Sequence, residues 1–79
     1  MMIYCNIKKK NDNSAIYLFG TSTNDITGEA EFFSTFTEPK IFKQPETRDV
    51  PLSQLSRIVV KYRSELTHGK FPERMSYER

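Results

Sequence analysis

The sequence feature that most constrains this chain is one amphipathic stripe near its C-terminal end. At about 100° per residue, the apolar residues of this region fall within an arc of roughly 120°. They are Leu52, Leu55, Ile58, Val59, Tyr62 and Leu66. Val60 lies off the stripe. The pattern predicts one amphipathic helix, and a helix with a single apolar face needs a layer of partner structure to cover it.

Local signals at both ends set the bounds of this helix at about 51–68. Pro51 suits the first helical turn, and Asp49 or Ser53 can cap the free amides there. Gly69 allows the left-handed backbone that ends many helices, and Pro72 follows just beyond it. We therefore predict a helix of about four to five turns.

The N-terminal half carries strand signals instead. Ile3, Cys5 and Ile7 alternate with polar side chains, which predicts a half-buried strand over about 2–9. Turn-prone residues follow, and then a run over 15–20 that is apolar on both faces predicts a second strand and a hairpin.

Two further strand segments come next. Alternation resumes over 27–37, with Phe32 and Phe36 on one face and Phe33 on the other. Residues 40–44 lie between two prolines, so a strand there belongs at a sheet edge.

The last segment, residues 70–79, fits neither period. Its apolar residues Phe71, Met75 and Tyr77 are spaced by four and then two positions, so it either docks on the core or adds a short strand at the sheet edge. We predict an α+β fold: a three- to four-stranded antiparallel meander with one C-terminal amphipathic helix packed on one face.

Length and composition place this fold in a single domain over residues 1–79. A chain that forms two domains needs roughly 100 residues or more for each. Four Tyr and six Phe argue against a disordered chain. The one cysteine cannot form an internal disulfide, and the apolar run at 1–5 is too short for a membrane span or a signal-peptide core. We therefore expect a cytoplasmic protein.

Catalytic motifs are missing from the sequence. It contains no GxGxxG, HExxH or GxSxG, which serve nucleotide binding, zinc hydrolysis and serine hydrolysis. Cys5 belongs to the inward face of a predicted strand and His68 to the polar side of the helix, so neither is expected to act as nucleophile or base. These two are the only soft metal ligands. We expect no enzyme, no cofactor and no metal.

Three carboxylates are the best remaining candidates for chemistry: Asp25, Glu29 and Glu31. The two glutamates share one strand face at a spacing of roughly 7 Å, which suits a hard cation or acid–base work. An outward face with Lys40 or Lys43 as cross-strand partners explains them without a site. We favour that interpretation.

Surplus aromatic surface points to the binding of another protein. Phe33 lies beside Glu31 on the predicted outer face, where one helix cannot cover it, and Tyr17 belongs to the strand that is apolar on both faces. The tail rings of Phe71 and Tyr77 can cover this surface, and so can a second copy or another protein. An edge strand also invites strand addition. These five residues form the candidate protein interface.

A basic stripe supports an alternative. Arg57, Lys61 and His68 project within about 60° of one another on the polar side of the helix. The first hairpin adds three cations: Lys8, Lys9 and Lys10. Cations beside exposed rings suit phosphates and bases, although a net charge of +2 is also typical of an ordinary solvated surface.

We therefore expect a small non-catalytic interaction or regulatory protein. We expect it to bind a protein partner or itself through the sheet face or edge. We expect no binding to a membrane. The alternative is a small nucleic-acid-binding protein that uses the basic helix face and the Lys8–Lys10 hairpin.

Overall fold

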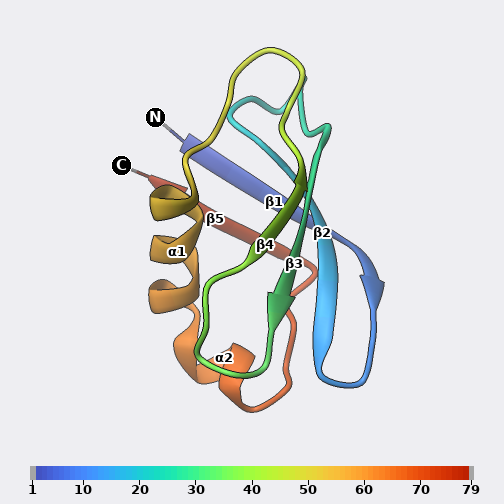
Figure 1. The fold of residues 1–79 in the computed structure, drawn as a ribbon, viewed down its shortest axis with the longest axis vertical. Coiled ribbons are helices and arrows are strands. Elements are labelled where there is room, and N and C mark those ends of the chain that lie inside the picture. The colour runs from blue at the N-terminus through green and yellow to red at the C-terminus, as the bar shows by residue number, and fades with distance from the viewer. Residues whose placement is uncertain (1, 79) are drawn as a thin grey trace.

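The computed structural model describes residues 2–78, which form a five-stranded antiparallel sheet with two helices packed against it (Figure 1). Along the chain the elements are β1 (Met2–Lys10), β2 (Ser14–Gly20), β3 (Gly28–Phe33), β4 (Lys40–Lys43), α1 (Leu52–Lys61), α2 (Arg63–Thr67) and β5 (Arg74–Glu78). The strand order is β4-β3-β2-β1-β5. The predicted α+β class is confirmed, and the predicted three to four strands are corrected to five.

The first four strands form the predicted meander. The β1–β2 hairpin closes where the Asn11 amide donates to the Ser14 carbonyl over 2.8 Å, and a register shift between Ile7 and Lys9 bulges β1 near that turn. β4 lies at a sheet edge, as its flanking prolines require. The predicted hairpin and the predicted edge strand are both confirmed.

β3 is shorter than the alternating pattern over 27–37 predicts. It ends where the Ser34 amide donates to the Asn13 carbonyl over 2.9 Å. The Thr37 amide then donates to the Thr35 carbonyl over 2.7 Å, and the hydroxyls of the two threonines are 3.1 Å apart. Such local hydrogen bonds compete with a strand ladder, so residues 34–39 form a loop between β3 and β4.

The single helix predicted over 51–68 is two helices. α1 ends at Lys61, Tyr62 departs from helical geometry with φ −104° and ψ 22°, and α2 follows directly. The predicted stripe is buried at Leu55, Ile58, Val59 and Leu66. Its first residue, Leu52, stays 38% exposed.

The two helix-end signals differ in outcome. Pro51 stands at the N-cap of α1 without any side-chain cap, so the predicted capping by Asp49 or Ser53 is wrong. Gly69 has φ +73°, and its amide donates to the Leu66 carbonyl over 3.0 Å. The left-handed stop at Gly69 is therefore confirmed.

The segment that fits neither period contains the fifth strand. β5 pairs antiparallel with β1, and its Met75 is buried opposite Cys5. Phe71 is buried in the turn before β5, which explains its irregular spacing from Met75. The Tyr17 hydroxyl donates to the Pro72 carbonyl over 2.5 Å and fastens this turn to the middle of the sheet. Residue 79 of the predicted tail lies outside the described residues.

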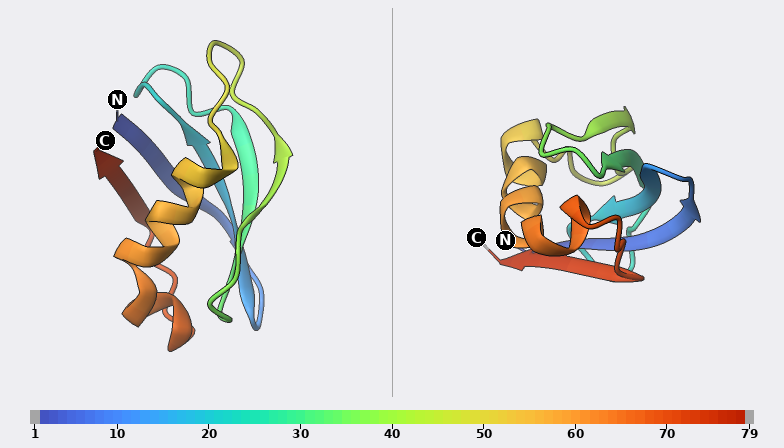
Figure 2. Two further views of the ribbon diagram at one scale, coloured as in Figure 1. Left: turned by 60° about the vertical axis from the view of Figure 1, so that its left-hand side comes forward. Right: turned by 90° about the horizontal axis from the view of Figure 1, so that it is seen from below.

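Both helices cover one face of the sheet, which curls around α1 (Figure 2). On that face the rings of Tyr17 and Phe32 meet edge to face, with centroids 5.3 Å apart, and Phe19 is fully buried beside them. The other face is left uncovered by every element within residues 2–78. The core therefore lies between α1 and the concave side of the sheet.

A polar network fastens the β2–β3 loop to the connection between β4 and α1. Buried Asp25 accepts hydrogen bonds from the Thr27 hydroxyl (2.5 Å), the Thr47 amide (2.8 Å) and the Thr47 hydroxyl. Bonds from Thr27 and Thr47 lower the pKa of Asp25 to about 2. Gly20 permits the close approach, because a Cβ there would lie 1.7 Å from the Asp25 carbonyl oxygen.

Candidate interaction surface

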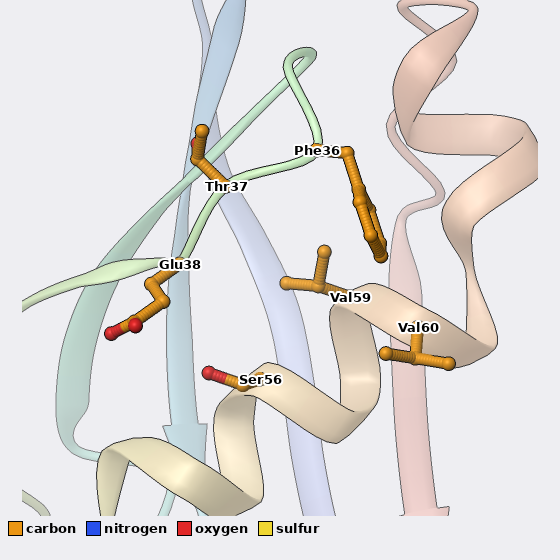
Figure 3. A pocket seen from close by; sticks show the side chains of 6 residues that line it. All are labelled: Phe36, Thr37, Glu38, Ser56, Val59 and Val60. Atoms are coloured by element: carbon orange, nitrogen blue, oxygen red, sulfur yellow. The ribbon is translucent and has the colours of Figure 1, made fainter.

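An apolar groove runs between α1 and the loop that joins β3 to β4 (Figure 3). It consists of two hollows of about 400 and 570 Å³ that share Glu38, Ser56 and Val60. We call the pair the α1 groove. Its lining residues are Phe36, Thr37, Glu38, Leu52, Ser53, Ser56, Arg57, Val59 and Val60.

The helix wall of the α1 groove is a row of residues spaced by four. Leu52, Ser56 and Val60 line up along one side of α1, because residues four apart are neighbours on a helix surface. Val60 is 62% exposed, whereas Val59, nearer the core, is buried. The row is therefore apolar at both ends, small in the middle and open to solvent.

The loop wall is built around Phe36. Its ring extends from the loop toward the helix, beside Val59 and Val60, and is 48% exposed (Figure 3). The Arg63 guanidinium carbon lies 4.3 Å from the centroid of this ring, a cation–π geometry that helps to hold it. The ring of the loop wall is thus held in position by a contact within the chain.

Two unpaired charges flank the α1 groove. Glu38 stands on the loop wall and Arg57 on the helix wall, and both are exposed. Within residues 2–78 neither forms a salt bridge. Arg57 is turned by roughly 100° from Ser56, on the side away from Val59 and the loop. The apolar row therefore lies between an acid and a base.

The predicted interface residues Phe33 and Glu31 lie on the uncovered sheet face, where both are half-buried. The neighbouring side chains on this face are both apolar and charged: Ile16 lies between Lys9 and Glu31 in cross-strand register. Glu31 accepts a hydrogen bond from the Ser14 hydroxyl over 2.6 Å. Charged and polar side chains thus interrupt the apolar ones on this face.

The other three predicted interface residues pack into or against the core. Tyr17 is fully buried, and this burial raises its pKa. Phe71 is buried, and Tyr77 lies opposite Ile3 on the inner face. The expected role of Tyr17 and Phe71 in an interface is therefore corrected: β5 and its preceding turn help to cover the rings that one helix could not.

The predicted basic residues divide between two sides of the molecule. Lys8, Lys9 and Lys10 lie at the β1–β2 hairpin, on the side away from α1 (Figures 1 and 2). Lys8 forms an ion pair with Glu29 over 2.9 Å.

The basic residues of the helices serve different contacts. The Lys61 ammonium donates to the Ser76 carbonyl over 2.7 Å, and Nδ1 of His68 lies 2.6 Å from the Ser64 carbonyl. Arg57 borders the α1 groove. The structure does not bring the hairpin and helix cations together on one surface.

One edge of the sheet is occupied by the end of α1. The Ser76 amide on the free side of β5 donates to the Tyr62 hydroxyl over 3.1 Å, and its carbonyl accepts from Lys61. These are backbone groups that an added strand would need. Strand addition at β5 is therefore opposed by side chains of this chain.

The cross-strand partners predicted for the acidic pair are in register. Lys43 lies opposite Glu29, and Lys40 lies opposite Glu31. The ion pair of Glu29 is nevertheless made with Lys8, two strands away. The Asp25 carboxylate accepts hydrogen bonds from Thr27 and Thr47 in the loop network, and it does not form a cluster with the two glutamates.

Cys5 is fully buried on the inner face, and burial raises its pKa to about 12. It is therefore a protonated thiol at neutral pH and a poor nucleophile. In the part of the chain that the structure describes, no three His, Cys, Asp or Glu gather to hold a metal ion. No helix within residues 2–78 is long and apolar enough to cross a membrane.

Compared with models of protein families, with curated proteins and with solved structures, the chain gives no match. The candidate site therefore depends on the geometry of its own residues.

Sequence reasoning missed the α1 groove. Alternation put Phe36 on the face of Phe32, but β3 ends before Phe36 and the ring turns to the helix instead. One signal was present: Val60 is apolar and lies off the helix stripe. An apolar residue on the outer side of a surface helix is a reason to look for a partner.

Proposed function

We propose that this chain is a small non-catalytic protein that binds a protein partner through the α1 groove. The observation that carries the proposal is the pair Phe36 and Val60, which are 48% and 62% exposed and line the same hollow from its two walls. Large exposed apolar side chains with charges at the rim are typical of protein-binding surfaces.

The α1 groove replaces the sheet face and edge as the proposed binding surface. Phe33 is the predicted ring that remains on the outer face, where its cross-strand partner Ser14 and its strand neighbour Glu31 are both polar. The free edge of β5 is occupied by Tyr62 and Lys61. The groove combines an open apolar surface with walls that this chain already holds in place.

A protein partner is favoured over nucleic acid by the distribution of charge. Glu38 in the wall of the groove repels phosphate, and the Lys8–Lys10 hairpin lies on the side of the molecule away from α1. The non-catalytic part of the proposal is supported by the inert state of Cys5. We keep the cytoplasm as the proposed location, with which a buried free thiol is compatible.

The test places a photoreactive group at the groove. Thr37→Cys introduces an exposed thiol in the groove, while buried Cys5 stays unlabelled by a photoreactive maleimide. Irradiation in an extract of the source cells should give a covalent adduct with a protein, and Val60→Glu in the same chain should abolish it. Thr23→Cys, exposed in the β2–β3 loop, is the matched control and should give no such adduct.

Two outcomes would contradict the proposal. An adduct that persists unchanged with Val60→Glu would show that the α1 groove does not hold the partner. A nuclease-sensitive adduct in place of a protein adduct would favour the nucleic-acid alternative.

A further inference from the structure

We propose that the occupant of the α1 groove is α1 of a second copy of this chain, in a two-fold dimer whose axis runs roughly along α1. This inference rests on the proposed function, because it names the partner of the same groove. Two features carry it: the spacing of the apolar row and the placement of the two unpaired charges.

The apolar row of α1 has a residue spacing that suits packing against another helix. Leu52, Ser56 and Val60 form one ridge of residues four apart, and such ridges interdigitate in the commonest class of helix pair. Ser56 at the middle of the ridge is small, so two helices can approach closely there. Leu52 and Val60 then bury their exposed surface in the groove beside the same row of the second copy.

The positions of the two unpaired charges, Glu38 and Arg57, determine whether a two-fold axis along α1 or one across it is favourable. An isologous interface is self-complementary, so a residue on one copy must meet its complement on the other. Glu38 and Arg57 flank the row on opposite sides. A two-fold axis along α1 exchanges these sides and brings each Glu38 to Arg57 of the other copy, giving two equivalent ion pairs. An axis across α1 would instead set like charges against each other, which opposes association.

A dimer of standard size needs a modest share of the surface of this chain. A standard interface buries about 800 Å² per partner. The described residues expose 4824 Å² in all, so a dimer of that size needs about a sixth of the surface. The outer side of α1, the ring of Phe36 and the loop around Glu38 form one continuous surface for this purpose.

Self-pairing through β4 is a weaker route to a dimer. Antiparallel pairing of two β4 strands about their common centre sets Lys40 of one copy opposite Lys43 of the other. Like charges directly opposite in a sheet are destabilising. The charges of the α1 groove favour association, whereas those of β4 oppose it.

The first experiment is sedimentation equilibrium of the purified full chain at concentrations up to roughly 1 mM, a range that captures weak dimers. We compare wild type, Glu38→Arg, Arg57→Glu and the double variant. Each single reversal should weaken the dimer by at least about tenfold, and the double reversal should restore it to within about threefold of wild type. Glu46→Arg and Arg48→Glu, both exposed and outside the groove, should leave the dimer unchanged.

A second experiment tests where the axis passes. Ser56→Cys places a thiol at the middle of the ridge, so a short bis-maleimide should join two copies there. Thr23→Cys is the control and should stay uncoupled under the same conditions. Both variants should unfold at the wild-type urea midpoint, which separates a lost interface from a lost fold.

The outcomes separate this inference from the proposed function. A chain that stays monomeric throughout the concentration range overturns the dimer, as does a dimer that neither single charge reversal weakens. If the purified chain is monomeric while the Thr37→Cys probe captures another protein in a Val60-dependent way, the dimer fails and the proposed function stands. If the purified chain is monomeric and the Thr37→Cys probe captures no protein in a Val60-dependent way, both the dimer and the proposed function are overturned.

Discussion

At the scale of single residues, the Asp25 carboxylate holds two loops together through hydrogen bonds from Thr27 and Thr47. These bonds lower its pKa to about 2 from an ordinary value of 3.8. A lowered pKa gives stabilisation that is fully present above the unfolded value and is lost as the pH falls through the folded value. We therefore expect the free energy of unfolding to decrease between about pH 4 and pH 2.

Asp25→Asn tests this dependence. It should lower the free energy of unfolding at pH 7, and its difference from wild type should shrink as the pH falls from 4 to 2. Urea titrations at stepped pH measure both quantities. Asp49→Asn, at an exposed carboxyl of the connection before α1, is the matched control. A difference between Asp25→Asn and wild type that is constant with pH would contradict the argument.

Cys5 gives a second prediction at this scale. Because it is fully buried and its pKa is about 12, a thiol reagent can reach it only when the sheet opens. Labelling of the native chain at pH 8 should be at least about 100-fold slower than labelling in denaturant. Stopped labelling followed by mass spectrometry measures the two rates. Comparable rates would mean that Cys5 is accessible, and would reopen a reactive role for it.

At the scale of elements, the junction of α1 and α2 protects the free edge of β5. The Tyr62 hydroxyl accepts from the Ser76 amide, and Lys61 donates to the Ser76 carbonyl. Tyr62→Phe leaves the edge amide without this partner, so we expect a loss of about 1 kcal/mol in the free energy of unfolding and more association at the edge. Urea titration and light scattering over several days measure these effects. Ser64→Ala, at an exposed position of α2, should change neither.

The helices and strands also show which parts of the fold the sequence patterns predict correctly and which they do not. Period and flanking prolines correctly predicted the first hairpin, the edge strand and the buried stripe of the helix. The pattern over 27–37 failed after Phe33, because local hydrogen bonds of Thr35 and Thr37 end the strand where alternation continues. An alternating pattern indicates which side chains suit a strand. It does not indicate whether each residue has a backbone hydrogen-bond partner on a neighbouring strand.

At the scale of the whole molecule, the candidate site could not be read from any one segment. The α1 groove joins the outer side of α1 to a loop that precedes it by many residues, and its walls meet only when the sheet curls around the helix. Tyr17 was predicted at an interface for the same reason. Its ring needed cover, and that cover is supplied by the turn at Pro72, far along the chain.

The same long-range contacts make β5 part of the core and not an appendage. Met75 and Phe71 are buried, and β5 pairs with the first strand of the chain. A chain that ends at Gly69 should therefore lose cooperative unfolding in urea and its native circular dichroism. Met75→Ala should cost about 2–5 kcal/mol, a large share of the roughly 4–12 kcal/mol expected for a domain of this length. Glu78→Ala, exposed on the same strand, should cost little. A shortened chain that unfolds cooperatively at the full-length midpoint would show that the four-stranded meander is stable without β5.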